Sequence, residues 1–460
     1  MFSIFSFAAN DGAARTPPMG WRSWNQYQGA ITQELMESNM KALARSLAQF
    51  GYRSAGLDDG WQACGHFGPQ AYRYHNASGA PVVNARTFPS MVNMTMLGRS
   101  LGLGVGWYGN ACGCVDGCCS DHCDSLECFA GDVSATIALG FTSYKVDSCG
   151  AQRDIELWHT MFNHSLRSIK GAAPMLLENC HDGEGAGKGI VPHYDEHGAL
   201  WCPFHTYRVS PDARPTYGSI LSNLNRSIAL LDANLSVPGC WGYLDMLEVG
   251  VTNTQFIQPG KHMNCGPDGE DKCKPLSVIE AQTHFGAWAI LSSPLVLGFD
   301  LGDAEQMRLH LPTITNREVI QINQDYHGFA GSRFYQSEDD LVEFEACGWG
   351  ASFPGRTNAS CAWPRFMSLY KPLSGTDARG SIMAVLLMNN GEEAAASLGF
   401  AWTDVPGLSK VPGIEKGGCV VFDVWRQESL GRVKGRKFVV ENVEARGSAF
   451  VTLAECGAHL

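Results

Sequence analysis

The segment from residue 141 to residue 150 holds two side chains whose spacing suits covalent chemistry. Its apolar, aromatic and β-branched residues predict a buried strand that ends at Asp147, before a Ser-Cys-Gly turn. Lys145 and Asp147 are two residues apart, so in an extended chain both project to the same face. A neighbouring ammonium favours the ionised carboxylate, and an ionised Asp can act as a nucleophile. The alternative interpretation is a structural ion pair at a strand end.

Further acids occupy similar positions. Asp58 and Asp59 close an expected strand before Gly60 and Trp61, and Asp245 lies in a later one beside Met246. A single Asp after a strand is more often a helix N-cap. Several such acids near aromatic residues are typical of a sugar site, where carboxylates accept hydroxyl hydrogens and rings cover C–H patches. The aromatic residues concerned are Trp21, Trp61, Trp107 and Tyr108.

Asp212 is the candidate for a second reacting group. It follows Arg208 in a loop that Pro211 and Pro215 stiffen. A retaining glycosidase needs an ionised nucleophile and a protonated acid about 5 Å apart. Asp147 suits the first role and Asp212 the second. The alternative interpretation is that Arg208 and Asp212 form a local ion pair within the loop.

Strands and helical patterns alternate over residues 16–320, which predicts a catalytic (β/α)₈ barrel. A doubly wound open sheet is the alternative, but no Gly-x-Gly-x-x-Gly turn follows the first strand. Helices are expected over residues 32–50, 155–169, 216–231 and 277–291. Strands are expected over residues 19–24, 53–58, 104–108, 142–147, 175–179, 200–204, 243–247 and 294–298.

Residues 321–460 lack helical periodicity and carry closely spaced strand patterns with Gly, Pro and Asn turns, which predicts an antiparallel β-sandwich. Strands are expected over residues 341–345, 366–370, 381–388, 419–425, 437–441 and 448–453.

The composition limits the classes of function. The chain has 460 residues, 45% of them hydrophobic and 17% charged, and a formal charge of -12, which argues against nucleic acid as a partner. No apolar run approaches the roughly 20 residues that span a bilayer. Residues 1–15 are expected to be a signal remnant or a disordered N-terminus. The 17 cysteines and the Asn-X-Ser/Thr sequons favour the secretory route, to the cell exterior or to a lysosome or vacuole.

These motifs, taken in order, resemble glycoside hydrolase family 27, the melibiase or α-galactosidase family, which also contains α-N-acetylgalactosaminidases. The match covers nearly the whole chain. Its motifs are Thr16-Pro-Pro-Met-Gly-Trp21, Leu57-Asp-Asp-Gly-Trp61, Gly106-Trp-Tyr108, Tyr144-Lys-Val-Asp-Ser-Cys149, Arg208-x-x-x-Asp212, Asp245-Met246 and Phe422-Asp-Val-Trp425.

The resemblance implies a barrel followed by a sandwich, and a double displacement that needs no metal or organic cofactor. Asp147 would be the nucleophile and Asp212 the general acid/base, acting on terminal α-galactosides of glycans. Asp58 and Asp59 would hold O4 and O6, Lys145 O3 and O4, Arg208 the O2 side and Asp245 the 2-position. Trp21, Tyr108 and Met246 would line the sugar. Dimers occur in this family, so a homodimer is an open alternative.

The resemblance also implies disulfides. Cys149 would pair with Cys112 or Cys114, and Cys180 with Cys202. The six cysteines between Cys112 and Cys128 form an unusually large insertion, for which a metal cluster is the alternative.

Two departures from the family pattern bear on specificity. The run Cys180-His181-Asp182-Gly183-Glu184 stands where α-galactosidases carry a Glu that contacts the 2-hydroxyl and N-acetylgalactosaminidases carry small residues. His181 is a candidate for that contact, and the alternative is a histidine of the loop without a role in binding. Gly60 replaces a cysteine that many relatives carry. The rival hypotheses are an α-N-acetylgalactosaminidase or other α-galacto-type glycosidase, and a catalytically silent glycan-binding protein on the same fold.

Overall fold

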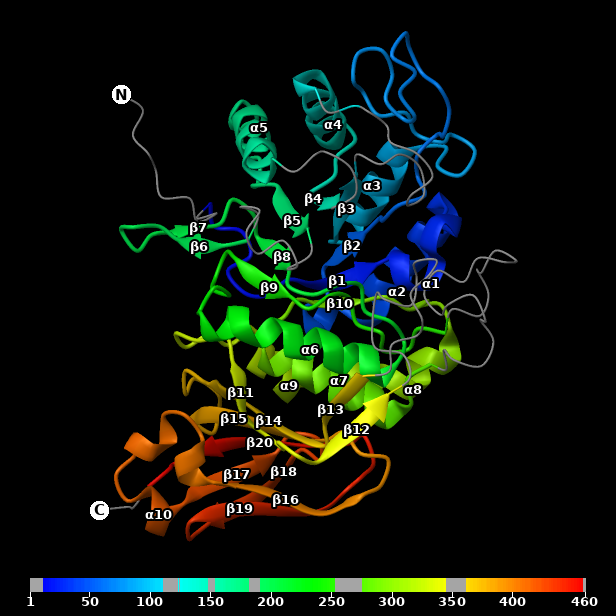
Figure 1. The fold of residues 1–460 in the computed structure, drawn as a ribbon. Coiled ribbons are helices and arrows are strands. Elements are labelled where there is room, and N and C mark those ends of the chain that lie inside the picture. The colour runs from blue at the N-terminus through cyan, green and yellow to red at the C-terminus, as the bar shows by residue number, and fades with distance from the viewer. Residues whose placement is uncertain are drawn as a thin grey trace.

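A computed structural model describes residues 11–110, 123, 125–147, 154–181, 191–252, 275–344 and 361–457. The barrel and the C-terminal sheets form two layers, with helices α6, α7, α8 and α9 between them (Figure 1). Among the described residues, no helix is long and apolar enough to cross a membrane.

Eight parallel strands form the barrel sheet, in the order β10-β1-β2-β3-β4-β5-β8-β9. Beyond β9, the Leu247 amide donates to the Val296 carbonyl at 2.8 Å, and Leu247 bridges to Leu297, which brings the two ends of the sheet together. The predicted (β/α)₈ barrel is therefore confirmed. The strands are β1 (Met19–Arg22), β2 (Ser54–Gly56), β3 (Gly104–Gly109), β4 (Ser143–Asp147), β5 (Leu176–Cys180), β8 (Thr206–Arg208), β9 (Trp241–Tyr243) and β10 (Leu295–Leu297).

Polar caps fix where several barrel helices begin. The side chains of Thr32, Ser90, Asp154, Thr216 and Ser277 each accept a hydrogen bond from a backbone N–H of the first turn. The four predicted helices are present, with boundaries within a few residues. The helices are α1 (Trp24–Tyr27), η1 (Gln28–Ala30), α2 (Gln33–Ser46), η2 (Ala48–Phe50), α3 (Met91–Ser100), α4 (Leu126–Ala138), α5 (Ile155–Arg167), α6 (Tyr217–Asp232), α7 (Val278–Ile290), α8 (Ala304–Ile314) and α9 (Arg317–Gln324).

The sixth barrel strand lies later in the chain than expected. Residues 200–204 were predicted to form it, but Leu200–Trp201 is β7, which pairs with β6 (His193–Tyr194) in a hairpin outside the barrel. Pro203 has no N–H to donate to a ladder, and the chain enters the barrel only at Thr206. The seventh strand likewise ends at Tyr243, so Asp245 follows the strand.

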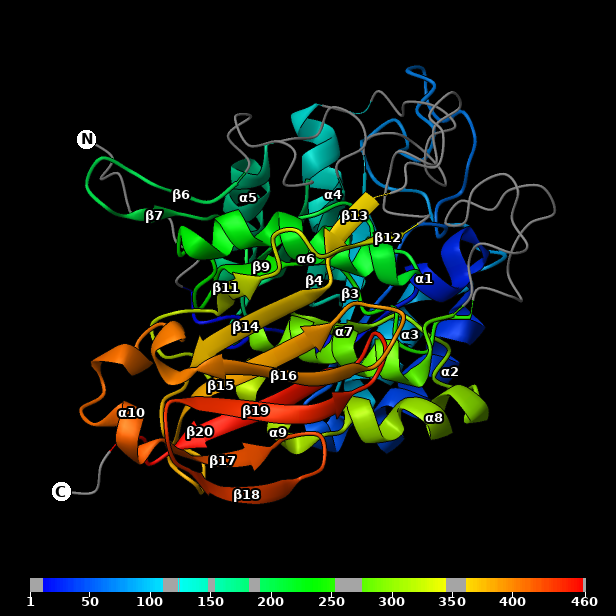
Figure 2. The same ribbon diagram turned by 60° about the horizontal axis from the view of Figure 1, so that its bottom comes forward.

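The C-terminal part is an antiparallel sandwich, as predicted. A six-stranded sheet, β11-β14-β15-β20-β17-β18, faces the β16–β19 pair, and Phe400 and Phe438 of the pair pack with Val385 and Val451 of the sheet (Figure 2). Strands β11, β13, β16 and β18 were not predicted. The elements are β11 (Ser332–Gln336), β12 (Leu341–Phe344), β13 (Cys361–Pro364), β14 (Phe366–Pro372), β15 (Ser381–Asn389), β16 (Ala395–Ala401), η5 (Trp402–Asp404), η6 (Leu408–Lys410), α10 (Ile414–Gly417), β17 (Cys419–Asp423), β18 (Glu428–Val433), β19 (Lys437–Val443) and β20 (Ser448–Ala454).

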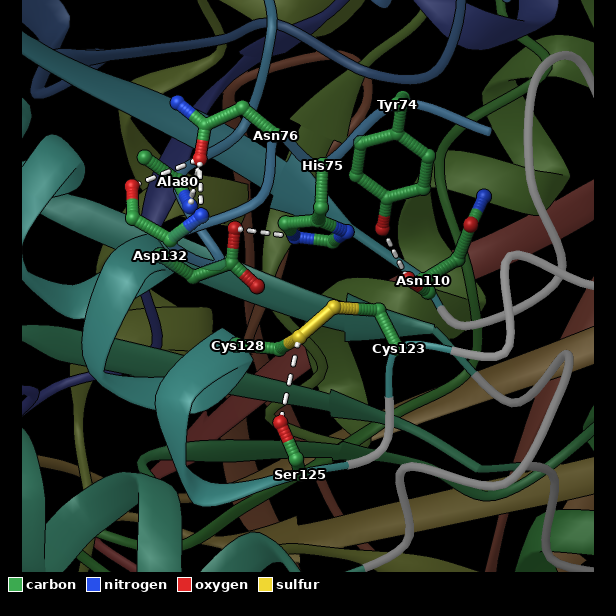
Figure 3. The surroundings of a disulfide bond; sticks show 10 residues. Tyr74, His75, Asn76, Ala80, Asn110, Cys123, Ser125, Cys128 and Asp132 are labelled. Carbon is green, nitrogen blue, oxygen red and sulfur yellow. Dashed lines mark hydrogen bonds and ion pairs between the residues drawn. A yellow bond between two sulfur atoms is a disulfide. The ribbon is translucent and has the colours of Figure 1, made fainter. Parts of the chain in front are cut away.

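The long connection after β2 is held to the barrel by polar contacts beside a disulfide. His75 Nε2 donates to Asp132 Oδ1 of α4 at 3.1 Å, and the Tyr74 hydroxyl donates to the Asn110 carbonyl. Cys123 and Cys128 are bonded next to this pair (Figure 3). These contacts anchor the connection beside the end of β3 and the middle of α4.

Candidate active site

The predicted site residues come from the carboxyl ends of neighbouring strands. Asp58 and Asp59 follow β2, Tyr108 lies near the end of β3, and Asp147 ends β4. His181 follows β5, Arg208 ends β8, Asp212 lies four residues later, and Asp245 follows β9. Because the carboxyl ends of parallel strands meet at one end of a barrel, these side chains gather at the face where barrel enzymes carry their chemistry.

A buried charge network underlies this face. Lys145 Nζ lies 2.9 Å from Asp58 Oδ2, so its ion pair is with Asp58 across the sheet and not with Asp147. Arg22 Nη1 approaches the same oxygen at 3.4 Å, and Arg22 Nη2 binds Glu178 Oε2 at 2.8 Å. Two cations and two anions thus lie together, which is how charges are tolerated in a barrel interior.

The pKa values in this network move in the direction that keeps it ionised. Burial alone would raise the pKa of Asp58, but the charges of Lys145 and Arg22 outweigh it and lower that pKa. Burial would lower the pKa of Lys145, but the Asp58 carboxylate raises it well above its ordinary value. Asp58 is therefore a fixed anionic acceptor, suited to sugar hydroxyl groups.

Asp147 is oriented by Tyr108 of the neighbouring strand. The Tyr108 hydroxyl donates to Asp147 Oδ2 at 2.5 Å, and Asn110 Nδ2 donates to the Tyr108 oxygen at 3.0 Å. Lys145 Nζ lies 5.3 Å from the centre of the Tyr108 ring, which favours the cation. Asp147 itself is half-buried, so its carboxylate keeps access to the barrel mouth.

Arg208 joins the other acids. Its Nη1 lies 3.0 Å from Asp212 Oδ1, 3.1 Å from Asp245 Oδ1 and 3.4 Å from Cys180 Sγ. Arg208 and Asp245 are buried, whereas the Asp212 side chain is 40% exposed. Burial raises the pKa of Asp245 to about 7, with Arg208 opposing the shift and Asp212 adding to it. Asp212 is thus the acid of this group that a bound molecule could reach from the barrel mouth.

Cys180 links the two halves of the site. It is the register partner of Asp147 on β5, and Arg208 donates to its sulfur. Burial raises the pKa of this thiol, and both Asp147 and Asp212 act on it electrostatically. The two acids therefore flank Cys180 at the same end of the barrel.

The two Trp side chains of the first motif lie in different hydrophobic clusters. The Trp21 indole is buried in the main core, with Nε1 donating to the Phe299 carbonyl at 2.7 Å. Trp24 forms a separate small cluster with Tyr243 and Met246. The alternation of β1 ends at Arg22, and the start of α1 turns the second Trp of the motif toward Met246.

The remaining predicted side chains are tightly held. Asp59 is fully buried, and its Oδ1 accepts from the Gly60 amide at 2.8 Å. Gly60 has φ 106°, and a Cβ there would lie 2.8 Å from Gly29 Cα, so this position requires glycine. His181 Nδ1 lies 2.6 Å from Asn179 Oδ1, and its ring is buried beside the end of β5.

Near the site, the sequence interpretation missed the buried charged residues Arg22, Glu178 and Glu248. Arg22 and Glu178 lie inside apolar strands. Charged residues are rarely buried unless they are paired, so their positions in the sequence could have predicted a buried ion pair. Glu248 is fully buried, with Oε1 accepting from Asn25 Nδ2 at 3.0 Å. Burial raises the pKa of Glu248 well above the ordinary range, and the negative charge of Asp245 raises it further.

The predicted Cys180–Cys202 disulfide is wrong. Cys202 is bonded to Cys240, and Cys180 is a buried free thiol. The reason is the shifted sixth strand, because β8 begins four residues after Cys202 and leaves that residue outside the barrel. Cys419 and Cys456 form a further disulfide in the sandwich. Cys112, Cys114 and Cys149 lie outside the described residues, and among the described residues no cluster of three metal-ligating side chains occurs.

No model of a protein family matches the chain. Curated relatives do. The probable α-galactosidase D of Aspergillus terreus is 30% identical over 341 residues, 70% of this chain and 44% of the relative. The α-galactosidase of Oryza sativa subsp. japonica is 26% identical over 363 residues, 78% of this chain and 74% of the relative. The chain belongs to the α-galactosidase family, glycoside hydrolase family 27.

The fold of this family member agrees with solved structures. The crystal structure of α-galactosidase I from Mortierella vinacea aligns with a TM-score of 0.71 at 21% identity, over 98% of this chain and 100% of that one. The chain spans less than half the length of the Aspergillus relative. At this identity the structural likeness supports the barrel and sandwich, and the reaction is argued below from the residues.

Proposed function

We propose that this family member is a retaining exo-acting glycosidase that removes terminal, non-reducing α-D-galactosyl residues from glycans. The observation that carries the proposal is the pair of acids on either side of Cys180. Asp147 is its register neighbour on β4, and Asp212 binds the same Arg208 Nη1 that contacts the Cys180 sulfur. Two carboxyl groups at one barrel mouth are what a double displacement needs.

In the first step Asp212, protonated, gives its proton to the glycosidic oxygen while Asp147 Oδ1 or Oδ2 attacks the anomeric carbon. The bond to the departing alcohol breaks, and an ester between Asp147 and the sugar forms. In the second step Asp212, now ionised, takes a proton from water as that water attacks the same carbon, and the ester releases Asp147 and galactose. Each step inverts the anomeric carbon, so the overall configuration is retained.

The buried charges supply substrate recognition. Asp58, held ionised between Lys145 and Arg22, and its neighbour Asp59 suit the O4 and O6 hydroxyls that distinguish galactose. Lys145 and Arg208 then contact O3 and the O2 side, with Asp245 and His181 at the 2-position. The apolar face of the sugar would pack on the cluster of Trp24, Tyr243 and Met246.

Three disulfides among the described residues support the secretory route, because such bonds persist in oxidising compartments. We therefore propose an extracellular, lysosomal or vacuolar site of action on glycan substrates.

The test is a panel of nitrophenyl α-glycosides at acidic pH, measured with wild type, Asp147→Asn and Asp212→Asn. We expect hydrolysis of the α-galactoside but not of the α-N-acetylgalactosaminide, and loss of turnover in both variants. Asp195→Asn, which alters an exposed carboxylate on the β6–β7 hairpin, is the matched control and should keep full activity. Preference for the N-acetylated substrate would contradict the assigned specificity. Turnover in Asp147→Asn would contradict the assigned nucleophile, and an inactive wild type that binds galactose would be a glycan-binding protein.

A further inference from the structure

Asp245 has a backbone conformation that its own residue type disfavours. Its φ is 90°, in a region where an L residue with a Cβ is strained. Such a conformation persists only where the surroundings fix it. Both oxygens of the Asp245 carboxylate have partners. Oδ1 lies 3.1 Å from Arg208 Nη1, and Oδ2 accepts a hydrogen bond from the Ala213 amide at 2.6 Å.

Helix α7 supplies the contacts that hold this turn. Trp288 Nε1 donates to the Asp245 carbonyl at 2.8 Å, and one helical turn earlier His284 Nε2 accepts from the Glu248 amide at 3.1 Å. The two α7 rings meet edge to face, with centroids 4.1 Å apart. Both side chains are fully buried. The strained turn is thus fixed at its first and fourth residues by one rigid face of a helix.

The opposite side of α7 is packed against the sandwich. The helix contacts β14, β15 and β20, and a Cβ on Gly286 would lie 2.9 Å from Trp425 Cζ2. The Trp425 indole has little room to give, because its Nε1 donates to Ser448 Oγ at 3.2 Å and its ring packs on Phe450. Helices α6, α7, α8 and α9 lie between the barrel and the sandwich in Figure 1.

We propose that Trp288 is a positioning residue that sets the Asp245 carboxylate for the 2-position of the sugar, and that the C-terminal sandwich braces this contact through α7. This inference rests on the proposed function, because it deepens the role of Asp245 in that site. It assigns the sandwich a part in substrate binding that the barrel residues alone do not explain.

The test compares the same substitution at two buried tryptophans. Trp288→Phe removes the indole N–H and keeps a buried ring. Trp402→Phe, the matched control, removes a buried indole that donates to the Gly435 carbonyl at the same distance of 2.8 Å, inside the sandwich. We expect Trp288→Phe to raise both KM and the dissociation constant for galactose by about fivefold, the change that one lost hydrogen bond produces, with a smaller change in kcat. Trp402→Phe should leave both constants unchanged. A purely structural role would lower the folded fraction and therefore apparent kcat, but not KM.

Galactose binding, measured by titration calorimetry on the full chain, separates the inference from the proposed function because it needs no turnover. Wild-type protein that binds galactose without hydrolysing the galactoside would overturn the proposed function, and the variants could still be compared with it for galactose binding.

Gly286→Ala is the second variant. Alanine suits a helix better than glycine, so the helix is kept while the new methyl group displaces it from Trp425. Galactose should again bind more weakly. Unchanged galactose binding in Trp288→Phe or Gly286→Ala, or an equal loss in Trp402→Phe, would overturn the proposal, as would wild-type protein that does not bind galactose.

Discussion

The Tyr108 hydroxyl donates to the Asp147 carboxylate across two neighbouring strands, with 2.5 Å between Tyr108 Oη and Asp147 Oδ2. A hydrogen bond to a charged group contributes about 1.5–3 kcal/mol. Tyr108→Phe should therefore lower kcat by roughly 10- to 100-fold, because the bond orients Asp147 and stabilises the carboxylate that leaves when the glycosyl ester breaks down. Steady-state kinetics measures this. Tyr207→Phe, which loses a hydrogen bond from a buried phenol to the Leu235 carbonyl, is the control and should keep its kcat. Equal rates for the Tyr108 variant and wild type would remove Tyr108 from the mechanism.

The Arg22–Glu178 ion pair should contribute strongly to stability. Glu178→Gln leaves the buried Arg22 guanidinium with only the more distant Asp58, at 3.4 Å, and breaking a buried pair typically costs 3–5 kcal/mol. We expect the free energy of unfolding in urea to fall by about 3 kcal/mol. Glu305→Gln breaks an exposed pair with Arg308 on α8 and should change nothing measurable. A loss for Glu178→Gln no larger than that of the control would show that the network is not held by its charges.

Lys371 should give the protein a characteristic dependence of stability on pH. It is fully buried and donates to the Ile322 and Asn323 carbonyls near the end of α9, and burial lowers its pKa to about 7 from an unfolded value of 10.5. Between these two values the unfolded chain holds a proton that the folded chain lacks. This group therefore makes the free energy of unfolding rise with pH across that window, by up to about 1.4 kcal/mol per pH unit.

Lys371→Met removes that contribution and leaves the other titrating groups in place. The difference between wild type and variant, measured by urea unfolding at several pH values, should shift in favour of wild type as the pH rises from 7 to 10. A difference that stays constant over this range would mean that Lys371 remains charged in the folded protein.

The cysteine pairing has a direct chemical test. Peptide mapping without reduction should recover a Cys202–Cys240 cross-link, and alkylation of the unfolded, unreduced chain should label Cys180. The bond joins residues 38 apart, so Cys240→Ala should reduce the free energy of unfolding by about 4 kcal/mol in the loop-entropy model. Cys180→Ala leaves the covalent framework intact and is the control. A Cys180–Cys202 peptide would contradict the structure.

The sequence predicted the structure correctly where residue types and the spacing of apolar residues indicated the same element. The repeated alternation of strands and helices identified the barrel, and the acids at strand ends indicated where its chemistry lies. The exceptions have local causes. Pro203 and the hairpin packing of Trp201 displaced the sixth strand, and that shift also overturned the cysteine pairing. Trp21 and Trp24 are equally aromatic in sequence, and only the end of β1 decides which hydrophobic cluster each of them joins.

Long-range pairings were beyond the reach of the sequence. Lys145 and Asp147 share a strand face, yet the Lys145 ammonium pairs with Asp58, which is 87 residues away. The hydrogen bond from Trp288 of α7 to the Asp245 carbonyl likewise joins residues that are 43 positions apart. Such contacts form only when the barrel closes. Periodicity predicts that a barrel forms, but it does not predict which residues then face one another.

The most direct test of the account is to trap the glycosyl-enzyme. A slowly turned-over fluorinated α-galactosyl fluoride should label the protein with one sugar, and mass spectrometry of the digested protein should find that sugar on the peptide that contains Asp147, with no label in Asp147→Asn. A sugar ester on a different carboxylate, or an active enzyme that never accumulates an ester, would contradict the central claim that Asp147 is the nucleophile.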